Sequence, residues 1–206
     1  MNIFAIHNNY PNTDNNPANT SLLIKEPVVY TLTDTALTRD GRPFFIPDYA
    51  SPCTFQMSLV MRICRLGRSI SPRFANRYYD AMTVGVMFTA QNILEQCRQY
   101  SLPWELAKGF DGAAAIGRFN SQSEEYHENR PIHFYLKQND VIVQEGNSSE
   151  AIFSPSLLIS YISKFYTLRQ GDLLYTGFPC KANIAKENTH LAAYMDNTEV
   201  LSFNVK

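Results

Sequence analysis

The sequence predicts an α+β fold in which short strands outnumber the helices. Most apolar stretches have the length and the β-branched composition of strands. Only about three segments carry the capping or spacing signals of helices. No linker, repeat or low-complexity tract interrupts positions 21–206, and 206 residues suffice for one sizeable core. Residues 1–206 are therefore expected to form a single domain.

The N-terminal half is predicted to consist mainly of strands. The apolar start 1–6 and the β-branched stretch 21–37 both fit short strands. The clearest strand covers 55–64, where side chains alternate along most of the length, and a second apolar strand covers 83–89.

Three helices are predicted. Ser71 and Ser154 each precede a proline, which is the pattern of an N-cap followed by proline at the first helical position. The first pair is expected to open a helix through Tyr79, and the second a helix whose buried stripe reaches Phe165. Residues 91–100 also have apolar side chains at helical spacing.

The C-terminal half is predicted to return to strands. Residues 132–144 alternate around Asn139-Asp140, which indicates a hairpin. Short strands are expected at 173–176, 191–195 and 199–205.

The stretch 106–117 has neither helical period nor strict alternation, and it is rich in Gly and Ala. Such residues let the backbone approach another group closely. The only charged side chains within this central stretch are Lys108 and Asp111. They are interpreted either as a solvated or mutually paired couple in a tight connection, or as part of a functional site.

Composition excludes several classes of protein. The chain has 18 basic and 19 acidic residues and a net charge of −1, so no global field favours nucleic acid or an anionic membrane, although a local patch stays open. The four cysteines form no CxxC pair, which argues against a zinc knuckle or a disulfide framework. Without a signal-peptide pattern or a long apolar run, a soluble cytoplasmic protein is expected.

Familiar catalytic motifs are absent from the sequence. No HExxH, GxSxG, GxGxxG or GxxxxGK pattern occurs. His133 lies in a strand pattern and is expected to be an ordinary surface or core imidazole. Cysteine catalysis stays open, because a partner histidine need not be near in sequence.

Several segments taken together go further. The stretches Lys108–Asp111 (KGFD), Gln144–Asn147 (QEGN), Thr167–Asp172 (TLRQGD) and Thr176–Pro179 (TGFP) occur in this order. Their order and spacing resemble the fumarylacetoacetate hydrolase family, over nearly the whole chain. The resemblance implies an α+β fold on a mixed, partly rolled β-sheet, usually in a homodimer. It also implies hydrolysis, decarboxylation or isomerisation of small β-diketo or 2-oxo acids with magnesium or another divalent ion.

The resemblance fails at the metal ligands. Gln56 and Ser58 stand where the family has two glutamates, and Met87 stands where it has an aspartate. Gln91 replaces an arginine, and Asn92 a second aspartate. Oxygen-ligated divalent ions depend on carboxylate charge, so no metal ligands and no cofactor are predicted.

The family's N-terminal His–Glu dyad is missing as well. Tyr10 follows Asn9 as in the family's NYxxHxxE segment, but Thr13 and Asn16 take the places of the dyad. Neither side chain titrates near neutral pH, so neither can act as a general base. Residues 1–20 are interpreted as a lid segment whose composition fits order and flexibility equally well.

The favoured hypothesis is a pseudoenzyme that keeps the fold, a small-molecule pocket, a small carboxylic acid as ligand and a homodimer. The alternative is a metal-independent enzyme in which Lys108 reacts with a 2-oxo or β-diketo acid. A retained metal-dependent reaction is the least favoured. Neither nucleic acid nor membrane is expected as a partner. The predicted pocket residues are Tyr10, Gln56, Ser58, Met87, Gln91, Asp111, Thr176, Gly177 and Phe178.

Overall fold

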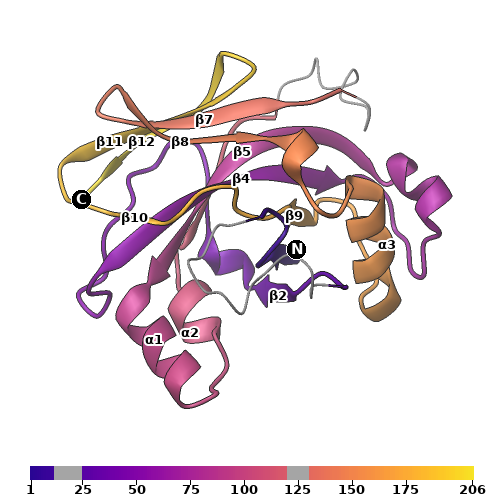
Figure 1. Cartoon of the computed structure of the whole chain (residues 1–206), viewed down its shortest axis with the longest axis horizontal. Coiled ribbons are helices and arrows are strands. Elements are labelled where there is room, and N and C mark those ends of the chain that lie inside the picture. The colour runs from indigo at the N-terminus through magenta and orange to yellow at the C-terminus, as the bar shows by residue number, and fades with distance from the viewer. Residues whose placement is uncertain (12–24, 120–129) are drawn as a thin grey trace.

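The computed structural model describes residues 1–11, 25–119 and 130–206, and its strands form two sheets (Figure 1). In the larger, eight-stranded sheet the order is β2-β1-β9-β4-β5-β6-β3, and β10 pairs with β4. The strands of this sheet are β1 (Ile3–Ile6), β2 (Val29–Leu32), β3 (Leu37–Thr38), β4 (Cys53–Ile63), β5 (Tyr79–Ala90), β6 (Ala114–Ile116), β9 (Leu173–Tyr175) and β10 (Asn183–Ile184).

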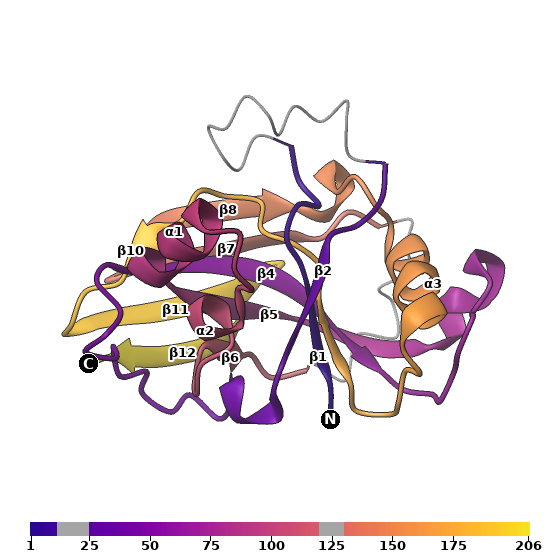
Figure 2. The same cartoon turned by 90° about the horizontal axis from the view of Figure 1, so that it is seen from below.

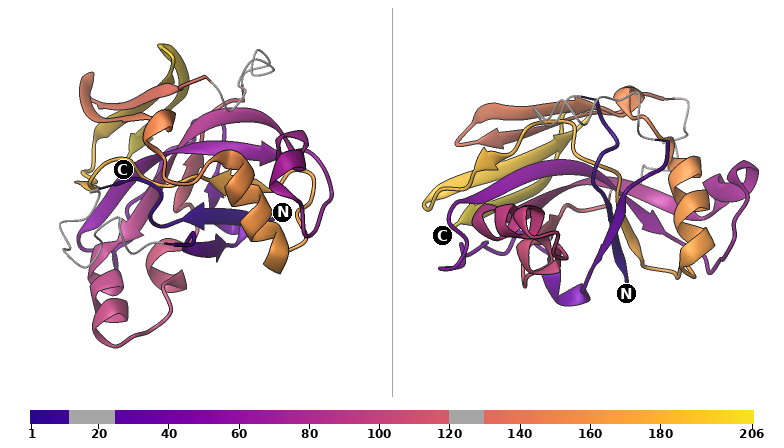
Figure 3. Two further views of the ribbon diagram at one scale, coloured as in Figure 1. Left: turned by 45° about the vertical axis from the view of Figure 1, so that its right-hand side comes forward. Right: turned by 60° about the horizontal axis from the view of Figure 1, so that its bottom comes forward.

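The smaller sheet has the order β12-β11-β7-β8 and is wholly antiparallel. Its strands are β7 (His133–Gln138), β8 (Val141–Asn147), β11 (Thr189–Met195) and β12 (Thr198–Val205). They form a layer beside β4 and β5 (Figure 3). The hairpin and the two last strands predicted from the sequence are thus confirmed.

The larger sheet is mixed, because β1 runs parallel to β9 and β3 parallel to β6 while its other pairs are antiparallel. It curls into a half-barrel (Figure 2). The α-helices of the described chain are α1 (Gln91–Gln99), α2 (Glu105–Lys108) and α3 (Pro155–Phe165). Figure 1 shows α1 and α2 at one end of this sheet and α3 at the other. The predicted α+β class, with a mixed and partly rolled sheet, is confirmed.

The long pair β4–β5 separates two apolar cores. Met57 and the other odd-numbered residues of β4 belong to the larger core, which also contains Phe134 and Leu191 from the inner face of the smaller sheet. Val60 of β4 and Met87 of β5 instead belong to the core inside the half-barrel. Side chains alternate between the faces of a strand, so the even-numbered residues of β4 point into the half-barrel. Both faces are covered, which is why these strands are apolar almost throughout.

The two Ser-Pro signals have different outcomes. Ser154 caps α3, since its hydroxyl accepts a hydrogen bond from the Leu157 amide, as predicted. The helix predicted at 71–79 is wrong: Pro72–Arg77 forms only a 3₁₀ helix, and Ser71 makes no capping bond. Only Ala75 of that segment is buried, so no apolar stripe stabilises a longer helix.

The stripe predicted for α3 is wrong at its last residue. Phe165 is 61% exposed, whereas Leu158, Ile159 and Ile162 are buried. The central stretch 106–117 also differs from the predicted connection, because it contains the end of α2 and all of β6. Strand β6 pairs with both β3 and β5 and is fully buried. A strand covered on both faces loses the alternation by which it could be recognised.

No helix in the described part of the chain is long and apolar enough to cross a membrane.

Candidate functional site

The interior of the half-barrel is apolar at the position that the resemblance assigns to a metal ligand. Met87 is 3% exposed and packs in one cluster with Tyr175 and Phe178. The Tyr30 hydroxyl donates to Met87 Sδ over 3.7 Å. Burial raises the pKa of the Tyr30 and Tyr175 phenols far above the usual range, so both rings stay neutral. This part of the interior therefore carries no negative charge.

Gln56 and Ser58 point into the same interior from β4, opposite Met87 and Gly85 on β5. Gln56 Nε2 donates to the carbonyl oxygen of Cys180 over 2.6 Å. Ser58 is fully buried, and its hydroxyl donates to the Leu59 carbonyl over 3.1 Å. The donors of both side chains are thus bound to backbone carbonyls, and neither side chain carries charge.

Lys108 lies beside this cluster at the end of α2 and is only 5% exposed. Its Nζ donates to Thr89 Oγ1 over 3.3 Å. The same nitrogen lies 5.6 Å from the ring centroid of Tyr30 and 5.8 Å from that of Phe178. A cation at these distances is attracted to the ring faces, which helps to hold the ammonium group at the edge of the apolar interior.

Lys108 also lines a cleft of about 190 Å³ between β2 and the segment that joins α1 to α2. Tyr30 and Trp104 supply aromatic walls, and Glu105 supplies a carboxylate. The His7 ring packs edge-on against Trp104 with centroids 4.9 Å apart. The cleft thus combines apolar walls with one buried cation, which suits a small organic molecule that carries an anionic group.

Motif residues near the predicted lid make scaffold bonds. Asn9 is buried; its Oδ1 accepts from the Phe153 amide and its Nδ2 donates to the Thr176 carbonyl, both at 2.7 Å. Tyr10 hydrogen-bonds the Thr176 side chain, and its burial raises its pKa. Gly177 has φ +122°, and a Cβ there would lie 2.6 Å from Asn9 Cβ. These residues join the base of the N-terminal segment to the turn after β9.

Gln144 and Asp172 also belong to the scaffold. Gln144 Oε1 accepts from the Met57 amide over 2.7 Å, and its Nε2 donates to Asn183 Oδ1 over 2.7 Å. Asp172 is fully buried and accepts from the amides of Asn2 at 2.7 Å and Arg169 at 2.8 Å. Charge-assisted bonds of this kind satisfy a buried carboxylate. The surviving motifs therefore hold strands together.

Two predicted pocket residues point elsewhere. The Gln91 side chain donates along α1 to Glu95 over 3.4 Å. Asp111 is exposed in the turn after α2, and no ion pair between it and Lys108 occurs among the described residues. The dyad positions Thr13 and Asn16, and with them most of the predicted lid, lie outside the described residues.

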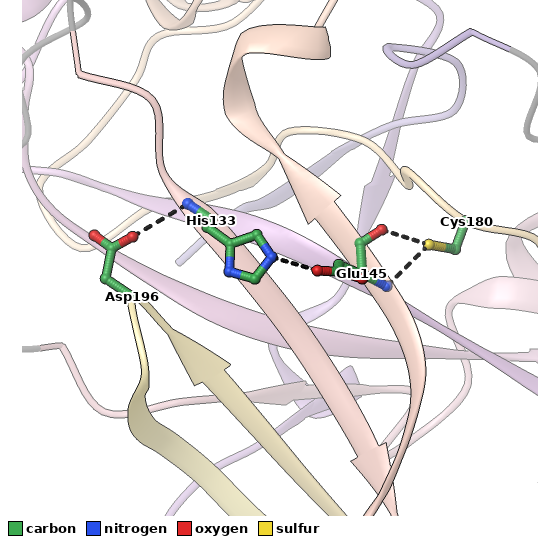
Figure 4. A network of polar contacts seen from close by, with 4 residues as sticks. All are labelled: His133, Glu145, Cys180 and Asp196. Atoms are coloured by element: carbon green, nitrogen blue, oxygen red, sulfur yellow. Dashed lines mark hydrogen bonds and ion pairs between the residues drawn. The ribbon is translucent and has the colours of Figure 1, made fainter.

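A second polar network lies on the smaller sheet (Figure 4). His133 Nε2 and Glu145 Oε1 are 2.6 Å apart. The Cys180 thiol donates to the Glu145 carbonyl over 2.9 Å and accepts from the Glu145 amide over 3.3 Å. Burial raises the pKa of this thiol, whereas a catalytic cysteine needs a lowered pKa. Cys180 bonds to backbone groups of Glu145. The network therefore joins the segment after β9 to β8, the strand at the edge of the smaller sheet.

The cleft beside Lys108 was missed at the sequence level. Its aromatic walls, Tyr30 and Trp104, come from segments far apart in sequence. The only local signal was the isolated lysine in a stretch of small residues. By contrast, Gln56, Ser58 and Met87 were placed by the resemblance, and the structure brings their positions to one wall of the half-barrel.

The donor set does not fit a divalent ion. An amide, a hydroxyl already bonded to a carbonyl and a thioether face the position where three carboxylates would be needed. Across the described residues, no group of three or more His, Cys, Asp or Glu side chains has a metal-binding arrangement.

Comparisons with known proteins agree with this fold. The family profile "Fumarylacetoacetate (FAA) hydrolase C-terminal" matches residues 2–204. Oxaloacetate tautomerase FAHD1, mitochondrial, of Mus musculus is 31% identical over 205 residues, which cover 100% of this chain and 91% of that protein. The Homo sapiens protein of the same name is 29% identical over the same shares.

Solved structures show the same architecture. Fumarylpyruvate hydrolase from Pseudomonas aeruginosa, crystallised with Mn²⁺ and pyruvate, superposes with a TM-score of 0.89 at 21% identity, covering 100% of this chain and 89% of that one. A fumarylacetoacetate hydrolase family protein from Yersinia pestis CO92 gives a TM-score of 0.85 at 25% identity, covering 100% and 92%. The motifs, the fold and the family profile agree over almost every residue: this chain belongs to the fumarylacetoacetate hydrolase family.

Proposed function

We propose that this chain is a family member without metal-dependent catalysis, and that it binds a small carboxylic acid in the cleft beside Lys108. The first part rests on the packing and hydrogen bonds of three neutral side chains at the positions of the family's metal ligands. Met87 is packed among aromatic rings, and Gln56 and Ser58 are bonded to backbone carbonyls. The fold is shared with relatives that bear enzyme names. The proposal rests on the three positions at which this chain differs from the metal-binding pattern of the family.

The second part rests on the one buried cation that lines this cleft. Lys108 Nζ is at hydrogen-bond distance from Thr89 Oγ1 and faces two rings. An ammonium group carries a full positive charge and three donors, so it attracts a carboxylate that enters from the cleft. The low polarity of the Tyr30 and Trp104 walls strengthens such a charge-assisted bond.

Trp104 is the only tryptophan of the chain and lines this cleft, so its fluorescence is a direct probe of binding. Pyruvate and oxalate are expected to quench or shift the Trp104 emission of the wild-type protein saturably. Lys108→Met should weaken that response about 10- to 100-fold, because a hydrogen bond to a charged group contributes ~1.5–3 kcal/mol. The matched control is Lys186→Met, an exposed lysine that does not line the cleft. An equal loss in both variants, or no response in the wild type, would refute the ligand site.

The burial of Lys108 also favours the alternative function, a metal-free reaction with a 2-oxo acid. Its neutral amine would attack the ketone carbon, water would leave, and an imine would form. Borohydride would then deliver hydride to that imine and leave a stable secondary amine on Lys108. We expect mass spectrometry of protein treated with pyruvate and borohydride to show no such adduct. A stoichiometric adduct lost in Lys108→Met would establish the enzyme instead.

Assembly belongs to the same proposal. The homodimer is a prediction from the family resemblance, and light scattering of the purified chain will show whether the mass is twice 23.5 kDa.

A further inference from the structure

The connection between β4 and β5, residues 64–77, is strongly basic and is called the basic loop below. Arg65, Arg68, Arg73 and Arg77 are all exposed, and the loop contains no Asp or Glu. Its charge of +4 stands out in a chain whose net charge is −1. None of the four arginines is paired with a carboxylate anywhere in the described chain.

Exposed apolar side chains accompany these charges. Leu66 is 70% exposed and Phe74 is 38% exposed. The guanidinium carbons of Arg73 and Arg77 lie 4.5 and 5.2 Å from the centroid of the Phe74 ring. Figures 1 and 2 show the loop at one extremity of the molecule, beyond α3. Apolar and cationic groups thus project together from a protruding part of the fold.

The end of α3 extends this surface. Gly67 exchanges two backbone hydrogen bonds with Leu168, at 3.0 and 2.8 Å, and the Ser69 amide donates to the Ser163 carbonyl over 2.8 Å. These bonds fix the basic loop against the segment that carries Lys164 and Arg169, both exposed. Phe165, 61% exposed, lies in the same segment. The surface therefore has six cations and three exposed apolar side chains on two elements that are bonded together.

We propose that this surface docks on an anionic lipid bilayer, as a local basic patch that departs from the absence of a membrane partner expected from the net charge of −1. Clusters of ~4–8 Lys and Arg side chains are typical of peripheral attachment to acidic lipids, and exposed Leu and Phe enter the headgroup boundary. Guanidinium groups bind lipid phosphates and carboxylates through paired donors. The protruding shape of the basic loop allows these contacts without any change in the fold.

Other polyanions fit the surface less well. Single-stranded nucleic acid is bound by rings with free faces on which bases stack, and two guanidinium groups already contact the Phe74 ring. The exposed Leu66 offers nothing to a phosphate backbone. A bilayer uses the cations and the apolar side chains at once.

The test is co-sedimentation of the full chain with vesicles. Binding is expected to phosphatidylcholine vesicles that contain phosphatidylserine, to weaken as salt is raised, and to be absent with phosphatidylcholine alone. Arg68→Ser/Arg73→Ser should lower the partition coefficient about 30-fold, because each basic side chain near an anionic surface contributes roughly a factor of five. The control Arg42→Ser/Lys186→Ser removes the same charge from exposed residues outside the basic loop and should bind as the wild type does.

Leu66→Ser leaves the charge unchanged and separates insertion from simple attraction. It should reduce binding about tenfold if the leucine enters the bilayer. Equal binding to neutral vesicles, an equal loss in both double variants, no effect of Leu66→Ser, or no binding at all would overturn the proposal. So would a tighter association with a single-stranded oligonucleotide than with the acidic vesicles. None of these outcomes depends on the cleft beside Lys108, because the variants leave its lining unchanged.

Discussion

Mn²⁺ added to the purified protein is expected to keep the electron paramagnetic resonance signal of the free aqueous ion, with no stoichiometric loss of intensity. The reason is the donor set inside the half-barrel. Gln56, Ser58 and Met87 are neutral, and a divalent ion taken from water needs carboxylate oxygens to offset its lost hydration. Isothermal titration calorimetry should likewise show only dilution heat. One tight site in the wild type, lost on adding a chelator, would refute the proposed loss of metal chemistry.

The converse experiment restores the three carboxylates. The variant Gln56→Glu/Ser58→Glu/Met87→Asp is expected to bind one Mn²⁺, because β4 and β5 place these positions on one wall of the interior. The matched control adds three carboxylates to exposed positions, as Asn76→Asp/Gln96→Glu/Gln99→Glu. It has the same net charge as the restored variant and should bind no ion stoichiometrically.

Phe178 is the expected obstacle to this restoration. Its ring is 3% exposed and belongs to the cluster that contains Met87. Adding Phe178→Thr to the restored variant should therefore tighten Mn²⁺ binding by making room for water ligands, which hard ions usually keep. If the opened variant still binds no ion, the missing carboxylates alone do not explain the loss.

The strands could be predicted from sequence, because they depend on residue type at a known spacing, and the same holds for the neutral side chains at positions 56, 58 and 87. β4 and β5 are recognisable because their apolar runs are long and bounded by turns. The failure at 71–79 has the opposite cause. Its Ser-Pro signal equals that before α3, but only Ala75 is buried there, and a capping signal without an apolar stripe does not hold a helix.

The cleft and the scaffold bonds could not be predicted, because they join residues that are distant in sequence. Tyr30 and Trp104 meet Lys108 only after β2 has joined the half-barrel. Asn9 bonds Phe153 and Thr176 in the same way. The motif letters of the family therefore mixed two kinds of residue, those that hold strands together and those that would hold a metal. In the structure, Asn9 makes bonds of the first kind, whereas Gln56, Ser58 and Met87 occupy the positions that the resemblance assigns to metal ligands.

Gly177 gives the sharpest measure of how firmly that scaffold is specified. Gly177→Ala is expected to lower the free energy of unfolding by ~3 kcal/mol or more, since a φ of +122° is a region that only glycine adopts readily. The new methyl group would also lie 2.6 Å from Asn9 Cβ. Asn9 would have to move, and its buried bonds to Phe153 and Thr176 would be lost. Thermal denaturation should show a Tm lower by ~6–12 °C.

Gly171→Ala is the matched control, because Gly171 also has a positive φ, +87°, but a Cβ there would meet nothing within 4 Å. This variant should lower the free energy of unfolding by only about 1 kcal/mol, because it introduces backbone strain without a steric clash. The difference between the two variants then isolates the contact with Asn9. Equal losses of unfolding free energy would mean that Asn9 can move aside at little cost. The base of the N-terminal segment would then not be held firmly against the turn after β9. A large excess for Gly177→Ala would show that the close approach of Asn9 requires glycine at this position.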